Sequence, residues 1–273
     1  MPRALDHIVW PTRDLDGLAA VFQSLGFTVG RQNRHPWGTL NRIVQFDGTF
    51  VELLGFADDY EPTGPEAAAE PFAGFCARFL DQRGPGPAML VLRSQDAEAD
   101  ARRLAAKGLG HGRLLPFSRS AQGPDGADKT VAFTIAFAVL PGLPAIGAFL
   151  CQQHRPENFW SPAAQRHANG ARGIASITVG GLKPADVGAQ ALRRFAQADE
   201  GAGDVRLADG SRLMLAPGAP PAMITEVAFA VADLSAVERL ADAAGIPCRS
   251  DGAGLVCGTA ASSDRDLAFV QSG

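Results

Sequence analysis

Apolar and polar positions alternate in the first residues of the chain. Across residues 5–10, His7 shares one side of the alternation with Leu5 and Val9. A period of two is typical of a strand with one buried face. We therefore expect a first β-strand that turns a histidine toward an apolar interior.

The pattern then changes to that of a helix followed by three strands. Asp14 is of a residue type that caps helices, and an apolar stripe follows it at helical spacing until Gly26. Strand-like runs follow at residues 27–32, 40–46 and 49–54. The predicted order of this first unit is β-α-β-β-β.

The rest of the chain repeats this unit in weaker form. A second unit is predicted from strands at residues 88–92, 113–117, 130–139 and 145–153 and a helix at 96–108, with a hairpin loop at 122–126. Shortened third and fourth units are predicted from strands at 173–179, 204–208, 211–215, 224–231, 247–250, 254–257 and 266–271 and helices at 184–195 and 235–244. A separate helix is expected at 72–82. Repetition on this scale is typical of tandem modules.

The four units suggest a chain in two halves. Residues 1–155 would hold the first two units in one domain, and the polar residues 156–172, with their prolines and glycine, would form a linker. Residues 173–273 would form a second, degenerate half. We expect an α+β fold in which tandem units form open mixed-sheet barrels.

Composition narrows the classes of function. The chain is 46% hydrophobic and 20% charged with a net charge of -4, as in soluble globular proteins. It has no basic stripe with interleaved aromatic residues, so nucleic acid is not an expected partner. It also has no run near the roughly 18 apolar residues of a membrane span, and no apolar leader, so we expect a cytoplasmic protein without a membrane partner. The four cysteines lack zinc spacing and are expected to be free, buried thiols.

Three segments of the first unit resemble the first module of the vicinal oxygen chelate superfamily. They are Leu-Asp-His-Ile-Val at 5–9, the helix between Arg-Asp-Leu-Asp at 13–16 and Leu-Gly-Phe at 25–27, and Phe-Val-Glu-Leu-Leu-Gly at 50–55. The superfamily includes glyoxalase I, extradiol dioxygenases and bleomycin-resistance proteins. Residues 34–41, Arg-His-Pro-Trp-Gly-Thr-Leu-Asn, are similar more narrowly to its glyoxalase-like-domain branch. The resemblance implies a glyoxalase-like fold.

His7 and Glu52 stand at the two positions that this superfamily uses for metal. From the residues alone, a core histidine bonded to a backbone carbonyl would be the better interpretation of His7. Glu52 alternates with Phe50 and Leu54, so it points to an apolar side, where an unpaired carboxylate is costly. We therefore expect a pocket in which both residues are metal ligands and Glu52 is also catalytic.

A set of polar and aromatic residues is expected around this pair. His35 is interpreted as a second catalytic residue, and Trp37, Thr39 and Asn41 as substrate-binding residues, with a purely structural turn as the alternative. His154 ends the last strand of the second unit. It would bind substrate in the same cavity if the first two units pair.

The later units differ at the two ligand positions. Alignment of the helix starts places Met89 and Cys151 there in the second unit, and neither suits a hard cation. The fourth unit places Glu226 and Gln271 there, which makes them further candidate metal ligands. Tandem relatives pair neighbouring units, whereas the ligand chemistry favours pairing the first unit with the fourth. We expect neighbours to pair.

The resemblance implies a small organic substrate or ligand and one divalent metal, with zinc, iron, manganese, nickel and magnesium all left open. Lyase, isomerase or dioxygenase chemistry would follow. The alternative is a metal-free protein that binds or sequesters a small molecule, as bleomycin-resistance proteins do. A nucleotide cofactor is not expected, because no glycine-rich run lies between a strand and a helix. A homodimer is left open.

Overall fold

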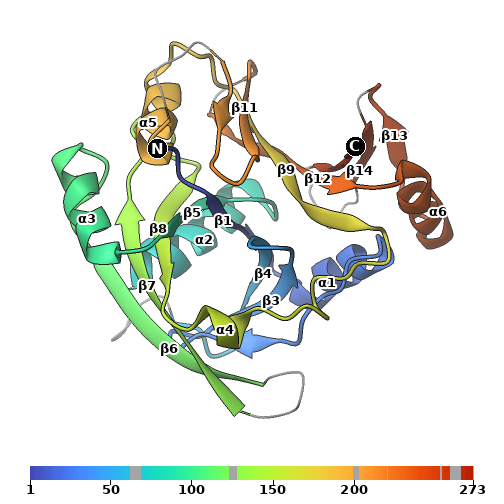
Figure 1. Ribbon diagram of the computed structural model, residues 1–273, viewed down its shortest axis with the longest axis horizontal. Helices are drawn as coiled ribbons and strands as arrows, with labels where there is room; N and C mark the ends of the chain where they lie inside the picture. The colour runs from blue at the N-terminus through green and yellow to red at the C-terminus, as the bar shows by residue number, and fades with distance from the viewer. Residues whose placement is uncertain are drawn as a thin grey trace.

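The computed structural model describes residues 1–61, 69–122, 128–198, 203–219, 221–252, 254–258 and 266–272. The side chains of residues 121, 122 and 266 are not described. Most of the expected hairpin loop at 122–126 lies outside these ranges. The strands form a mixed eight-stranded sheet and a mixed seven-stranded sheet (Figure 1). The α+β class and the glyoxalase-like architecture are confirmed.

The eight-stranded sheet comes from the first two units. Their elements are β1 (Leu5–Pro11), α1 (Leu15–Ser24), β2 (Asn33–Arg34), β3 (Thr39–Gln45), β4 (Phe50–Phe56), α2 (Glu70–Arg83), β5 (Met89–Ser94), α3 (Ala97–Ala106), β6 (Leu114–Gln122), β7 (Asp128–Ala138) and β8 (Gly147–Gln153). The strand order is β2-β3-β4-β1-β5-β8-β7-β6. Because β1 pairs with β5, the neighbouring units pair, as expected from the sequence.

The seven-stranded sheet comes from the last two units. After α4 (Pro156–Phe159), their elements are β9 (Ala171–Gly180), α5 (Val187–Ala196), β10 (Val205–Arg206), β11 (Arg212–Ala216), β12 (Met223–Val231), α6 (Leu234–Ala244), β13 (Cys248–Ser250), β14 (Gly254–Cys257) and β15 (Asp266–Gln271). The strand order is β10-β11-β9-β12-β15-β14-β13. Here too the neighbouring units pair, through β9 and β12.

Aspartate caps begin the helix in three of the four units. Asp14, Asp96 and Asp233 accept hydrogen bonds from the backbone N–H groups of Gly17, Ala99 and Ser235. A side-chain acceptor at this position satisfies one of the N–H groups that a helix start leaves unpaired. The same local chemistry therefore fixes the strand-to-helix turn in each of these units.

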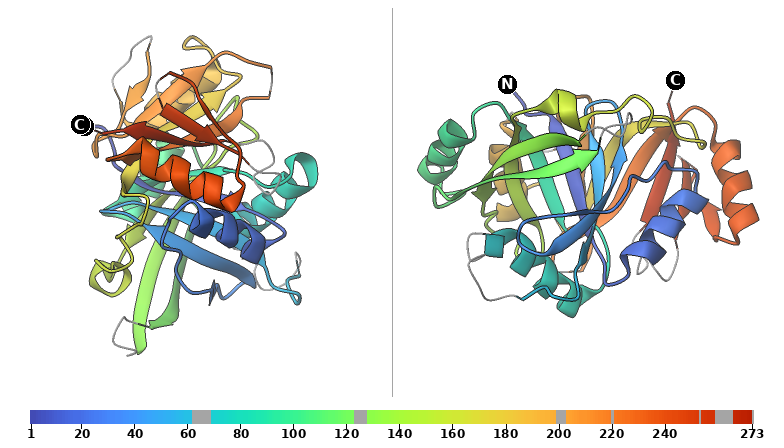
Figure 2. Two further views of the ribbon diagram at one scale, coloured as in Figure 1. Left: turned by 90° about the vertical axis from the view of Figure 1, so that its right-hand side faces the viewer. Right: turned by 90° about the horizontal axis from the view of Figure 1, so that it is seen from below.

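The two sheets share one apolar core. Helices α1, α3, α5 and α6 contribute to it together with the inner faces of both sheets, and α1 lies beside α6 (Figure 2). Phe22 and Phe27 of the first half contact Phe229 of the second, with ring centroids 6.5 and 4.8 Å apart. The halves are thus joined by burial of large rings as well as by the chain.

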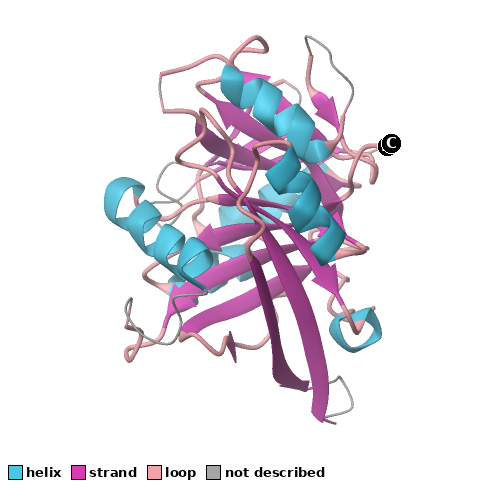
Figure 3. Cartoon of the chain, turned by 90° about the vertical axis from the view of Figure 1, so that its left-hand side faces the viewer, coloured by secondary structure: helices cyan, strands magenta, loops and turns pink. Residues whose placement is uncertain are grey.

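Side chains draw the edges of the eight-stranded sheet together into a nearly closed barrel. Arg119 of β6, on the long β6–β7 hairpin (Figure 3), donates from Nη1 to Asn33 Oδ1 of β2, at 2.9 Å. The rings of Trp37 and Phe117 lie 4.8 Å apart near the same two edges. Side-chain contacts between β2 and β6, the two edge strands of the sheet, therefore close the barrel. Among the described helices, none has the length and apolarity to cross a lipid bilayer.

Three expectations from the sequence are corrected. Residues 27–32 do not form a strand: Gly30 N donates to Ile43 O, but regular pairing begins only at β2. β6 runs five residues beyond the expected end at residue 117, to Gln122. Cys248 and Cys257 form a disulfide, because antiparallel pairing of β13 and β14 places their Cα atoms 4.1 Å apart. The other two cysteines are free and buried.

The expected linker at 156–172 begins with α4 and packs on the first sheet. Gln45 donates to the carbonyl oxygen of Phe159 and accepts from the N–H of Ser161. His167 accepts from Thr28 N through Nδ1 and donates to Gln45 O through Nε2. These contacts place Phe159 against the barrel. The division at residues 155 and 173 stays a prediction.

Candidate active site

A bulge in β1 places the first candidate residue. Leu5 is opposite Leu92 of β5 and His7 is opposite Val91, so Asp6 is an extra residue in the ladder. Leu5 consequently packs in the shared core, and it does not share a face with His7 as the simple alternation predicted. Bulges re-aim side chains near functional sites. Here the bulge turns His7 into the barrel while Asp6 stays beside it.

Asp6 orients the ring of His7. His7 Nδ1 lies 2.6 Å from Asp6 Oδ1, and both residues are buried. A carboxylate can only accept, so Nδ1 carries the hydrogen and Nε2 points the other way. Gln153 Nε2 donates to the second oxygen of Asp6 at 3.1 Å. The ring of His7 also stacks on Phe50, with centroids 4.2 Å apart.

Glu52 of β4 lies across from the free side of this ring. Its Oε2 is 3.8 Å from His7 Nε2, which is too long for a hydrogen bond. Its Oε1 accepts from Asn41 Nδ2 at 2.5 Å. Glu52 is 4% exposed. Burial raises the pKa of Glu52, the Asp6 charge adds to the rise, and His7, Asn41 and Arg119 oppose it. Its environment therefore favours the neutral carboxyl, with Oε2 left to carry the proton.

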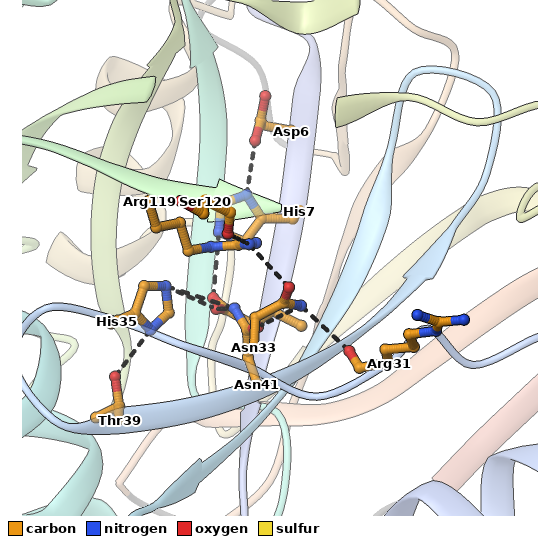
Figure 4. Close-up of polar contacts among 10 residues, drawn as sticks. Asp6, His7, Arg31, Asn33, His35, Thr39, Asn41, Arg119 and Ser120 are labelled. Carbon is orange, nitrogen blue, oxygen red and sulfur yellow. Dashed lines mark hydrogen bonds and ion pairs between the residues drawn. The ribbon is translucent and has the colours of Figure 1, made fainter. Parts of the chain in front are cut away.

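His35 stands on the other side of Glu52 and is held by a turn. The turn is fixed by His35 N donating to Thr39 O, and His35 Nδ1 lies 2.9 Å from Thr39 Oγ1 (Figure 4). His35 Nε2 is 3.6 Å from Glu52 Oε1 and 3.4 Å from Asn41 Nδ2. Burial, with the charges of Arg119 and His7, lowers the pKa of His35 to about 3. His35 is neutral near pH 7 and suits positioning more than proton transfer.

These side chains line an apolar cavity of about 40 Å³ inside the barrel. Its lining residues are His7, His35, Trp37, Asn41, Ile43, Phe50, Glu52, Phe72, Phe117, Arg119, Phe133, Ile135, Phe149, Cys151 and Phe159. The ring of Trp37 stacks on His35, with centroids 4.7 Å apart. The structure thus brings together five of the predicted site residues, with Thr39 just behind His35: His7, His35, Trp37, Asn41 and Glu52.

Three predicted residues lie elsewhere. His154 is exposed and contacts Thr134, on a different cavity from the one that holds Glu52. Glu226 belongs to the second sheet, where it accepts a hydrogen bond from Thr178. Gln271 ends β15 and donates to Ala232 O. None of the three lines the cavity around Glu52.

Strand register corrects two equivalences drawn from sequence. In the first unit Val9 is opposite Glu52, and in the second Val91 is opposite Phe149, so Phe149 and not Cys151 matches Glu52. In the fourth unit Ala228 is opposite Ala268, so Ala268 and not Gln271 holds that position. Short strands align easily in the wrong register, and only the paired partner fixes them.

Sequence reasoning missed Arg119 and Phe159. Arg119 was overlooked because the expected strand ended two residues earlier, although Arg119 continues the alternation begun by Phe117. Phe159 was overlooked because its segment was interpreted as a linker. In both cases the residue reaches the site through a contact between distant parts of the chain, which a local sequence pattern does not reveal.

The fold family implies a divalent metal, which needs a suitable donor set in the pocket. The ring nitrogens His7 Nε2 and His35 Nε2 lie 3.8 and 3.6 Å from the carboxyl oxygens of Glu52. Nevertheless, within the described ranges no three His, Cys, Asp or Glu residues are grouped to hold a metal. The second unit contributes Phe149 and Cys151 on its side, and neither suits a hard cation. The residues present do not fit a complete metal centre, so the predicted metal stays a prediction.

A family model described as a glyoxalase-like domain matches residues 5–195. The match crosses the domain boundary predicted at residue 155 and includes β9 and most of α5. No curated protein matches the chain.

Several solved structures have a similar fold. A hypothetical protein from Staphylococcus aureus is 12% identical over 98% of this chain and 99% of its own, with a TM-score of 0.66. A mutant of 4-hydroxymandelate synthase from Streptomyces coelicolor is 13% identical over 99% and 92%, with a TM-score of 0.60. A xylose isomerase-like TIM barrel/4-hydroxyphenylpyruvate dioxygenase fusion protein is 14% identical over 99% and 49%, with a TM-score of 0.56. At these identities the likeness shows the fold alone.

Proposed function

The chain belongs to the glyoxalase-like domain family, and on that premise we propose that its barrel pocket binds a small carbonyl compound and moves a proton on it. Glu52 is the acid and His7 is the base. The observation that carries this proposal is the pair itself: a carboxyl whose pKa burial raises faces the free nitrogen of an oriented imidazole across 3.8 Å. Proton-transfer sites typically place an acid and a base close together in surroundings that differ from one group to the other.

The proposed step uses only residues of this chain. His7 Nε2 removes a proton from the carbon beside the carbonyl, while the Glu52 carboxyl gives its proton to the carbonyl oxygen, so an enol forms. Return of the two protons to the groups and carbon they came from completes an exchange cycle. If the carbon beside the carbonyl carries a hydroxyl, the enol is an enediol; this hydroxyl then gives its proton to the Glu52 carboxylate while His7 delivers its proton to the former carbonyl carbon, which gives an isomer. Asp6 stabilises the imidazolium that His7 becomes. Asn41 holds Glu52 in place.

Isomerase chemistry, and lyase chemistry that begins with such a proton step, agree with this pair. Dioxygenase chemistry of a metal-dependent kind is not proposed, because its metal needs a larger donor set than the pocket offers. A metal-free binding protein is the second candidate. The observation that favours it is the ring of aromatic side chains around the cavity, which suits enclosure of a ligand with or without chemistry.

Proton exchange on a panel of simple carbonyl compounds tests the proposal. Small ketones and 2-oxo acids are incubated with the protein in D₂O, and loss of the proton signal beside the carbonyl is followed by NMR. We expect exchange above the buffer rate for at least one compound, and a loss of about 10²-fold or more in His7→Gln. Binding of the same compounds with no catalysed exchange would support the second candidate instead.

Metal content tests the donor-set argument separately. Protein purified and dialysed without chelator should retain well under one divalent metal per chain, and a chelator should leave exchange unchanged. One tightly held metal per chain that His7→Gln releases would instead support the metal-assisted chemistry expected from the sequence.

A further inference from the structure

Arg119 stands between the inner cavity and a larger outer cleft. The outer cleft has a volume of about 690 Å³ and lies at the mouth of the barrel. Ile43, Arg119 and Phe159 line both spaces. A molecule that places its reacting end beside Glu52 and extends to the surface therefore passes this guanidinium.

The guanidinium of Arg119 lacks a counter-ion among the described residues. Its Nη1 donates to Asn33 Oδ1 at 2.9 Å and to Ser120 O at 3.4 Å (Figure 4). Its Nε is buried with no hydrogen-bond partner. No described carboxylate lies within 4.0 Å of it, the limit for an ion pair. A desolvated cation without a partner is costly, and such groups are usually paired.

Glu52 does not supply the missing charge. Its Oε1 accepts from Asn41, and neither of its oxygens lies within 4.0 Å of the guanidinium nitrogens, the limit for an ion pair. An arginine remains protonated in proteins, so the unmet charge sits on Arg119.

The outer cleft carries further positive charge. Arg31, Arg34 and Lys129 line it against a single acidic residue among its lining, Asp128. Arg34 is neutralised by Asp59. The formal charge of the lining residues, Arg119 included, is positive, which favours an anion at the mouth of the barrel.

We propose that Arg119 binds an anionic group of the molecule whose carbonyl end enters the inner cavity. Resting on the proposed function, this assigns the substrate class: a small acid with an apolar or aromatic body, whose carboxylate lies against the Nε side of Arg119. A guanidinium fork matches two oxygens of one planar carboxylate. A phosphonate or phosphate offers similar oxygens, so the test includes one.

The test compares three probes of equal skeleton, phenylacetate, benzylphosphonate and neutral phenylacetamide, by titration calorimetry. Wild-type protein should bind phenylacetate at least about tenfold more tightly than phenylacetamide, as a charge-assisted hydrogen bond predicts. Arg119→Gln should abolish this preference and Arg119→Lys should weaken it. Arg102→Gln, on the exposed face of α3, removes the same charge away from the cleft and should leave the preference intact. Tighter binding of benzylphosphonate would assign a tetrahedral anion instead of a carboxylate.

Two variants separate this proposal from barrel closure and from proton transfer. Asn33→Ala removes the bond that joins the barrel edges but keeps the guanidinium, so the preference for phenylacetate should persist. Glu52→Gln should lose proton exchange and keep the preference. Equal binding of phenylacetate and phenylacetamide, no binding of either anion at millimolar concentration, or an unchanged preference in a folded Arg119→Gln protein would each overturn the proposal, whatever the exchange assay shows.

Discussion

The same strand framework appears twice in this chain, once with a pocket and once without. In the first sheet the position opposite Val9 is Glu52, and bulky rings surround it. In the second sheet the matching pair is Ala228 and Ala268, which form a small apolar cluster with Val256. The two sheets have the same strand register at this position, but the side chains differ. The first sheet therefore has a polar pocket there, whereas the second has an apolar sheet face.

Closure of the sheet is the second difference. The edges of the first sheet meet through Arg119 and Asn33 and through the rings of Trp37 and Phe117. Both sheets have one two-residue edge strand, β2 and β10, but the opposite edge is the nine-residue β6 in the first sheet and the three-residue β13 in the second. A carboxyl on an open sheet face stays in water and keeps its charge, whereas the same group inside a closed barrel is desolvated. The pocket is therefore a product of closure as much as of ligand residues.

The largest expected effect compares the two glutamates. Glu52→Gln should lower catalysed proton exchange by about 10²- to 10⁴-fold, because the variant cannot supply a proton from Oε2. Glu226→Gln makes the same chemical change in the second sheet and should leave exchange within about twofold of wild type. NMR exchange rates on the same compound measure both. Equal losses in the two variants would contradict an assignment of chemistry to the first sheet alone.

The next effect concerns the shared core. Phe229→Ala should lower the free energy of unfolding by about 3–5 kcal/mol, because a fully buried ring that contacts Phe22 and Phe27 is removed. Phe159→Ala, at the half-buried wall of the pocket, should cost less stability and weaken ligand binding more. Denaturant titration and calorimetry give the two quantities. If Phe229→Ala melted the second sheet while the pocket kept binding, the halves would not share a core.

Local pattern predicted the order of elements, and the family resemblance carried by short segments predicted the fold and part of the site. Aspartate caps, alternation and repetition are written within short stretches, and they predicted the order of elements. His7, Glu52, His35 and Asn41 were found because they fall within 46 residues of one unit and on one side of its strands.

Long-range geometry explains what the sequence could not predict. Arg119 and Asn33 are 86 positions apart and meet only because the sheet curls. The bulge at Asp6 is invisible in the alternation, which predicted Leu5 on the wrong face. Phe149 and Ala268 were misaligned because a strand of six or seven residues carries too little pattern to fix its register.

Stability should respond to pH through the pocket of the first sheet. His35 has its pKa lowered to about 3, so the unfolded chain binds more protons below pH 6.5, and stability is lost as pH falls from about 6.5 toward 3. Burial raises the pKa of Glu52, so this carboxyl contributes to the free energy of unfolding below pH 4.5. That contribution is lost as the pH rises through the pKa of Glu52 in the folded protein. Each group gives a slope of up to about 1.4 kcal/mol per pH unit, with opposite signs.

Two single variants separate these slopes. His35→Gln should remove the gain of stability with rising pH, and Glu52→Gln should remove the opposing loss. Urea titrations at a series of pH values measure the slopes. Identical pH profiles for wild type and both variants would mean that neither group titrates differently on folding.

The smallest effect on the pocket is expected from the disulfide of the second sheet. Cys248 and Cys257 enclose a loop with a sequence separation of nine, and a loop of this length is worth about 2.5 kcal/mol in the chain-entropy model. Cys248→Ser should therefore lower the free energy of unfolding by roughly that amount. Cys76→Ser, at a free and buried thiol beside the pocket, is the matched control without a crosslink. Ligand affinity should not change in Cys248→Ser, because the crosslink joins β13 and β14 on the far side of the shared core. A weaker ligand affinity in Cys248→Ser would show that the degenerate half helps to hold the barrel in its binding form.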